Sequence, residues 1–188
     1  MKLAWNMVNE PTALWVRVLK SKYKCDEGKS PNVQLTHSCS STWRAIVSVW
    51  DKMIEGMQWS IGNGRTINFW SHSWLPLGIV LNNIVMQPID PQIASKTVAY
   101  FSDNNGGWQL QEAVNMIPAY VIDQIQGCTA AADNLGEDRP SWPYSSNGVF
   151  AVKTAYDFLL STRTSDRVLW NNIWKWEGPQ KIKASYGW

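Results

Sequence analysis

The sequence predicts an α+β fold that is mainly helical and carries two β-hairpins, each anchored by a tryptophan in its incoming strand. Two patterns predict this fold: apolar residues recur at helical spacing in several segments, and the pairs Asn63-Gly64 and Asn147-Gly148 lie between alternating runs. The composition is that of a packed domain, because 45% of the 188 residues are hydrophobic and 17% are charged. Thirteen residues are Trp, and we expect most of them in the core.

The first predicted helix starts near Pro11, since proline is favoured at the first position of a helix. Its apolar residues recur at helical spacing and are predicted to form the buried face: Leu14, Trp15, Val18, Leu19 and Tyr23. The opposite, solvated face is predicted to carry three cations: Arg17, Lys20 and Lys24.

The second predicted helix has the clearest pattern in the sequence. We expect Ser41 as its N-cap and an end close to Gly56, because glycine commonly stops a helix. Its buried stripe follows the spacing i, i+3, i+4, i+7 and consists of Trp43, Ile46, Val47, Trp50, Ile54 and Met57.

After this helix the period of the apolar residues changes from 3.6 to 2. Alternating runs at 59–61 and 67–69 flank Asn63-Gly64, and both residues of such a pair tolerate positive φ. The same arrangement returns at 142–152 around Asn147-Gly148. We therefore expect a hairpin at each place.

The other predicted elements are less regular. Residues 79–97 are expected to form an irregular connector with two prolines, and 127–140 a linker. Further helices are expected at 97–101, from 108 to just before Pro118, at 119–125, from about 153, and at 169–174.

The charge is uneven along the chain, although the net charge is only +2. Residues 1–74 contain nine Lys and Arg against five Asp and Glu, residues 75–140 two against seven, and residues 141–188 six against three. Two mildly basic ends therefore flank an acidic middle. This asymmetry allows nucleic-acid contact at the ends without requiring it.

No pattern of residues typical of an active site is present, so we expect a non-catalytic chain without a cofactor. The sequence has no Asp-Asp pair of the kind that holds two metal ions in a polymerase, and its acidic residues lie outside the predicted strands. His72 lies between two serines without a Gly-x-Ser-x-Gly motif, and we interpret it as a surface-loop residue. Cys25, His37 and Cys39 are too few for a closed zinc site, so no metal is expected.

The sequence also bears on the cellular compartment. Its three cysteines include no Cys-x-x-Cys pair, and there is neither an N-terminal apolar run nor a stretch of about 18 apolar residues. We expect an intracellular setting, in the nucleus or the cytoplasm, and no contact with a membrane.

Five segments, taken in order, carry a resemblance to a known family. The most specific is Trp59-Ser60-Ile61-Gly62-Asn63-Gly64-Arg65-Thr66-Ile67-Asn68-Phe69-Trp70, followed by Trp74-Leu75-Pro76. The others lie at 14–23, 42–46, 146–156, and 170–175 continued by 179–183. Together they resemble plant LINE-type non-LTR retroelement proteins, often described as reverse transcriptase or ribonuclease H proteins, in the region after the polymerase.

The resemblance implies three parts. Residues 1–78 would form a helix–helix–hairpin segment after the polymerase, residues 79–136 an acidic helical connector and linker, and residues 137–188 the start of the reverse transcriptase zinc-binding domain. In the family the polymerase carboxylates would precede Met1 and the zinc ligands would follow Lys183, where Ala184–Trp188 diverges. We therefore expect a truncated fragment to which no catalytic or metal-binding residue carries over.

The resulting hypothesis is a non-catalytic fragment of a retroelement protein, acting as an accessory connector that contacts nucleic acid weakly and without sequence specificity. The candidate binding residues are Arg17, Lys20, Lys24, Lys175, Lys181 and Lys183. A competing interpretation makes these cations ordinary solvated side chains. Two further alternatives are a pseudogene-like product without a selected function and a domesticated protein-interaction module that presents exposed Trp side chains.

Overall fold

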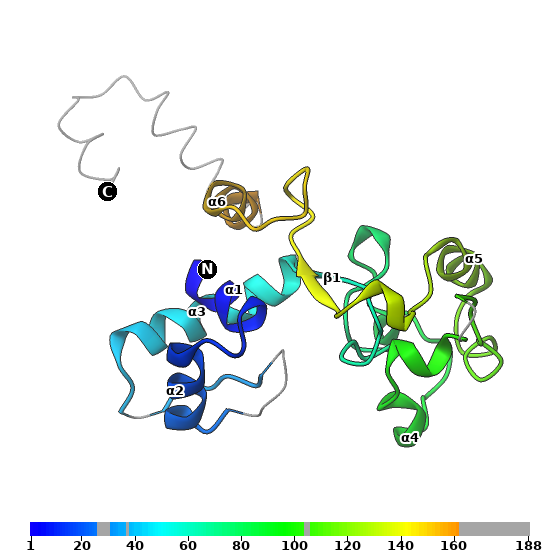
Figure 1. Cartoon of the computed structure of the whole chain (residues 1–188), viewed down its shortest axis with the longest axis horizontal. Coiled ribbons are helices and arrows are strands. Elements are labelled where there is room, and N and C mark those ends of the chain that lie inside the picture. The colour runs from blue at the N-terminus through cyan, green and yellow to red at the C-terminus, as the bar shows by residue number, and fades with distance from the viewer. Residues whose placement is uncertain (26–30, 37, 104–105, 162–188) are drawn as a thin grey trace. The chain divides into compact units, whose positions relative to one another are not determined.

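The computed structural model describes residues 1–25, 31–36, 38–103 and 106–161 of the 188 (Figure 1). The chain divides into two compact units, residues 1–150 and 151–188. The described part is mainly helical with one two-stranded antiparallel sheet, which confirms the broad α+β prediction. In the first unit the elements are α1 (Lys2–Asn9), α2 (Leu14–Tyr23), α3 (Ser41–Gly56), β1 (Gln58–Ser60), η1 (Pro76–Gly78), η2 (Leu81–Asn83), α4 (Pro91–Ala94), η3 (Val98–Phe101), α5 (Ala119–Gly127), η4 (Asp133–Leu135) and β2 (Arg139–Ser141). In the second unit it is α6 (Val152–Ser161).

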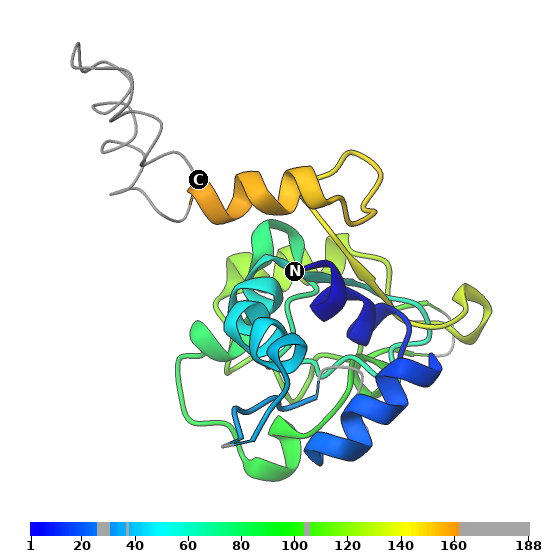
Figure 2. The same ribbon diagram turned by 90° about the vertical axis from the view of Figure 1, so that its left-hand side faces the viewer.

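Helix α3 forms as its pattern predicts. The Ser40 hydroxyl accepts a hydrogen bond from the Trp43 N–H at 3.2 Å and caps the helix one residue before the expected position. The buried side consists of Trp43, Ile46, Trp50, Met53 and Gly56. Helix α1, which the sequence analysis did not predict, packs against α3 and buries Ala4, Trp5, Met7 and Val8 (Figures 1 and 2).

Helix α2 forms where it was predicted, but it buries a different face. Val16 is 0% exposed and Lys20 is 9% exposed, whereas Leu14 and Val18 are 74% and 55% exposed. The prediction that Lys20 lies on the solvated face is therefore wrong. Val16 and Lys20 are also four residues apart, and the aliphatic stem of a lysine can cover apolar surface as a hydrophobic side chain would.

The predicted hairpin around Asn63-Gly64 is wrong. Strand β1 pairs not with residues 67–69 but with β2, in the antiparallel register Trp59↔Pro140. Residues beyond the turn bond elsewhere: the Val98 N–H donates to the Ile67 carbonyl at 2.9 Å, and the Phe69 N–H donates to the Lys96 carbonyl at 3.0 Å. Gly64 does have positive φ, +65°, but Asn63 does not, so the two-residue turn expected of a hairpin is absent.

The second predicted hairpin is also wrong. Trp142 and Gly148 close a compact loop in which the Trp142 N–H donates to the Gly148 carbonyl at 2.7 Å. Neither Val149 nor Phe150 belongs to a strand, and helix α6 begins at Val152. Strand β1, before the first predicted turn, thus pairs with β2, which lies just before Trp142. Neither strand pairs with the segment that follows its own predicted turn.

Between the strands, the helices expected at 97–101 and 119–125 are present as η3 and α5. The helix expected from residue 108 is wrong, because residues 111–116 form successive turns and Trp108 bridges to Ser102. In the segment predicted as a linker, Ala130, Ala131 and Asp138 are buried. The helix expected at 169–174 lies outside the described residues.

Tryptophan is a core residue in the described part of the chain. Seven of the nine described Trp side chains are buried and the other two, Trp15 and Trp108, are half-buried. Several indole N–H groups bond to backbone carbonyls, as Trp70 does with Ile93 at 3.0 Å. The exposed Trp patch expected of an interaction module is therefore missing from these residues. No helix among the described residues is long and apolar enough to cross a membrane.

Candidate functional site

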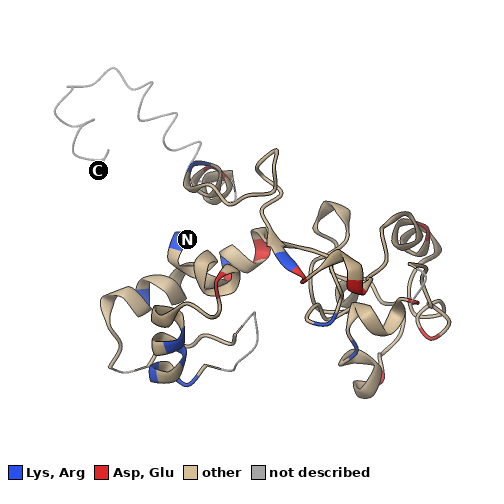
Figure 3. Ribbon diagram, in the orientation of Figure 1, with Lys and Arg blue, Asp and Glu red and all other residues tan. Residues whose placement is uncertain are grey.

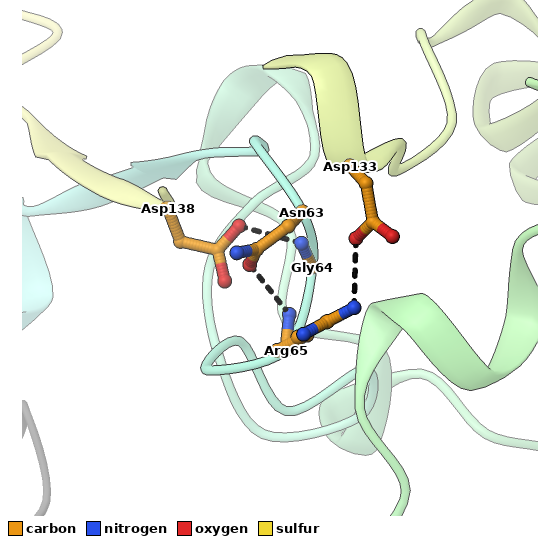
Figure 4. A network of polar contacts seen from close by, with 5 residues as sticks. All are labelled: Asn63, Gly64, Arg65, Asp133 and Asp138. Atoms are coloured by element: carbon orange, nitrogen blue, oxygen red, sulfur yellow. Dashed lines mark hydrogen bonds and ion pairs between the residues drawn. The ribbon is translucent and has the colours of Figure 1, made fainter. Parts of the chain in front are cut away.

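The most conspicuous polar site in the described structure is built around Asp138, which is only 2% exposed. One carboxylate oxygen accepts the backbone N–H groups of Gly62 and Gly64 at 2.9 and 2.8 Å. The other accepts the backbone N–H and the hydroxyl of Thr66 at 2.9 and 2.8 Å. We call these four residues the Asp138 network. Figure 4 shows the carboxylate pointing at the Gly64 N–H.

The Asp138 network explains why the expected hairpin does not form. A carboxylate accepts several N–H groups at once, and such charge-assisted bonds are stronger than neutral ones. The N–H groups of the turn are therefore satisfied by a side chain from the far end of the unit. Burial alone would raise the pKa of Asp138, but the hydrogen bonds from Thr66, Gly62 and Gly64 outweigh it and bring that pKa below its usual value of 3.8.

A second polar contact lies beside this network at the surface. The Arg65 guanidinium and the Asp133 carboxylate form an ion pair at 2.9 Å, with the two side chains 67% and 78% exposed (Figure 4). The Asn63 side-chain oxygen accepts the Arg65 backbone N–H at 3.2 Å. Because solvent screens exposed pairs, the Arg65–Asp133 contact is worth no more than about 1 kcal/mol.

His72 is not the surface-loop residue that its sequence neighbours indicate. It is half-buried and stacks on Trp59, with ring centroids 5.6 Å apart. Its Nδ1 accepts the Asn68 backbone N–H at 3.0 Å, which requires a neutral ring with its proton on Nε2. Burial lowers the pKa of His72, against a smaller opposing effect of Asp138, and this favours the same neutral form. Its role in the fold is thus that of a backbone acceptor.

The cations proposed for nucleic-acid binding separate into two kinds on α2. Arg17 and Lys24 are exposed, and neither forms an ion pair with any described residue. Lys20 faces inward beside Val16. Lys24 has φ +53° and ends the helix in the left-handed conformation. Figure 3 shows basic residues gathered along α2. Lys175, Lys181 and Lys183 lie outside the described residues.

The outer side of α2 forms a shallow depression, which we call the α2 face. It is lined by Leu14, Arg17, Val18, Ser21 and Lys22. At the end of the helix, Tyr23 stacks on Trp43 with ring centroids 4.2 Å apart, and its hydroxyl donates to Ser40 at 3.1 Å. These contacts fix the last turn of α2 against the first turn of α3.

The residues weighed as zinc ligands are not gathered into a site in the described structure. None of the three cysteines forms a disulfide, and each is half-buried. His37 lies outside the described residues. Among the residues that the structure describes, no group of three or more His, Cys, Asp and Glu lies close enough to hold a metal ion.

Two structural features escaped the sequence analysis. Asp138 carries no local signal, because its partners lie 72 to 76 residues earlier in the chain. The exposed pair Leu14 and Val18 was missed because its spacing is that of a buried stripe. A comparison of both possible faces of α2, counting the lysine stem as apolar, would have kept this alternative open.

Comparison with known proteins gives one distant similarity. The chain is 27% identical over 202 aligned positions to a protein of Arabidopsis thaliana named "Putative ribonuclease H protein". The alignment covers 97% of this chain and 30% of the relative, so the chain spans less than a third of that protein's length. No family model matches the chain. No solved structure matches it either.

Proposed function

We propose that this chain is a non-catalytic, folded connector of a retroelement-type protein and that it contacts nucleic acid weakly through exposed cations of α2. The observation that carries the proposal is that Arg17 and Lys24 on α2 are exposed and form no ion pair with any described residue. The similarity along 97% of the chain to a plant protein named for ribonuclease H supports a nucleic-acid context.

The acidic residues support a non-catalytic role because several of them hold the fold together. Asp138 is occupied by backbone N–H groups, and the Asp90 side chain caps α4 by accepting the Gln92 N–H at 2.7 Å. Glu112 accepts the Tyr100 hydroxyl at 3.0 Å. Polymerase and ribonuclease H chemistry needs carboxylates that converge on metal ions, and a carboxylate saturated by N–H donors is a poor metal ligand.

The cations support nucleic-acid contact through ordinary electrostatics. Each Lys or Arg that neutralises a phosphate releases counterions, so affinity falls steeply as salt rises. Arg17 lies within α2 and Lys24 directly follows its last residue, so both cations belong to this helix and its end. Two or three such contacts give weak binding without base recognition.

The catalytic part of the proposal is tested with the purified chain, a primed RNA template and an RNA–DNA hybrid, with Mg²⁺ or Mn²⁺. We expect neither nucleotide incorporation nor cleavage of the RNA strand above a buffer control. Activity that co-purifies with the chain through a further chromatographic step would contradict the non-catalytic assignment.

A further inference from the structure

The α2 face presents an apolar pair to solvent in the middle of a basic helix. Leu14 and Val18 are 74% and 55% exposed, and they are neighbours because they lie four residues apart. Leucine and valine side chains are often buried in a protein, as the side chain of Val16 is here. On the α2 face the two side chains form a small apolar patch, which is a candidate surface for contact with another molecule.

Cations surround this apolar pair on both sides. At 100° per residue, Arg17 lies on one side of Leu14 and Val18, and Lys22 lies on the other. Lys22 is exposed, with its ammonium group 5.4 Å from the centre of the Tyr23 ring. Arg17, Lys22 and Lys24 form no ion pair with any described residue. The α2 face is thus an apolar centre with a basic margin.

The positive charge of this basic margin limits which ligands can bind the α2 face. Two copies of this chain that met through their α2 faces would bring Arg17 and Lys22 against the same cations, and like charges in an interface oppose association. A duplex presents its phosphates outward and keeps its bases stacked inside, so it would offer Leu14 and Val18 mainly charged backbone. A single strand offers both kinds of group: base faces for an apolar centre and phosphates for a basic margin.

Building on the function proposed above, we infer that the α2 face binds single-stranded nucleic acid in preference to duplex. Leu14 and Val18 contact base faces, while Arg17 and Lys22 neutralise phosphates. Base contact of this kind is tolerant of sequence, because every base has an apolar face. The α2 face is therefore suited to an unpaired strand. Such strands occur beside a polymerase or a strand-cleaving enzyme.

The test compares binding of the full chain to a single strand of about 16 nucleotides and to a duplex of the same sequence, at low salt. The variant is Leu14→Gln/Val18→Gln, in which both helix positions receive a good helix former. The matched control is Met86→Gln/Leu135→Gln, which removes two other exposed apolar side chains, 62% and 47% exposed. Circular dichroism and thermal unfolding establish that both variants remain folded.

We expect the wild-type chain to prefer the single strand, and the α2 variant to lose about fivefold in single-strand affinity with little change in duplex affinity. The control should behave like the wild type. Equal binding of both nucleic acids, or an equal loss for both, would overturn this inference and leave the proposed function standing. No binding of either at low salt would overturn both. Binding of an acidic amphipathic peptide, with no single-strand preference, would assign the face to a protein partner instead.

Discussion

The Asp138 network and the α2 face handle charge in opposite ways. In the first, a 2% exposed carboxylate is fully used, since it accepts four hydrogen bonds from Gly62, Gly64 and Thr66. In the second, Arg17 and Lys22 remain exposed beside an apolar pair, with no ion pair to any described residue. The difference separates charge that builds the fold from charge that is available to a ligand. It predicts that changes at the first site affect stability and changes at the second affect binding.

The largest effect on stability is expected for Gly64→Val. Gly64 has φ +65°, and a Cβ there would come within 2.5 Å of the Ala131 Cβ and 2.7 Å of the Ala99 N. Backbone strain and overpacking together should lower the free energy of unfolding by about 3 kcal/mol or more. Chemical denaturation measures the change. The matched control is Gly127→Val, where φ is not positive and nothing lies within 4 Å of the added atom.

If both variants lost the same small amount of unfolding free energy, Gly64 would not be held between the segments of Ala99 and Ala131.

Asp138→Asn is expected to lower the free energy of unfolding by about 2 kcal/mol. An amide has only one acceptor atom, and its NH₂ group would face the backbone N–H donors. Asp133→Asn, in the exposed pair with Arg65, should cost less than about 1 kcal/mol. The acid dependence should separate the two variants as well. The folded pKa of Asp138 lies below its usual value of 3.8, so its contribution is present above that pH and is lost as the pH falls through the folded pKa.

The wild-type chain should therefore lose stability below about pH 4 more steeply than Asp138→Asn does. Parallel curves for the two proteins, from neutral to acid pH, would contradict the ionised network.

The same two regions show what local sequence could and could not predict. Helices α3, α5 and α6 follow from apolar spacing, because a helix bonds within itself and needs only one side buried. The Gly62–Thr66 turn could not be predicted in this way. Its Asn-Gly pair is locally a hairpin signal, but the bonds that decide its structure come from Asp138, 72 to 76 residues later.

Helix α2 is an intermediate case. Its existence and bounds follow from the sequence, yet its orientation does not. Val16 with Lys20 and Leu14 with Val18 have the same spacing, and tertiary packing selected the first pair for the interior. The prediction of the candidate cations was therefore wrong in one case. Arg17 and Lys24 are exposed as predicted, whereas Lys20 is buried. The resemblance to retroelement proteins came from ordered motifs, and the distant similarity to a plant relative agrees with it in part.

The most direct test of the account is the salt dependence of nucleic-acid binding after charge reversal on α2. Arg17→Glu/Lys24→Glu leaves the buried Lys20 in place and should weaken single-strand binding about tenfold, with a shallower slope of log affinity against log salt. Lys52→Glu/Lys153→Glu makes the same change in net charge at two exposed lysines elsewhere and should leave both quantities near wild type. An equal loss in the two double variants would show that net charge, and not the α2 face, governs binding, and would contradict the account.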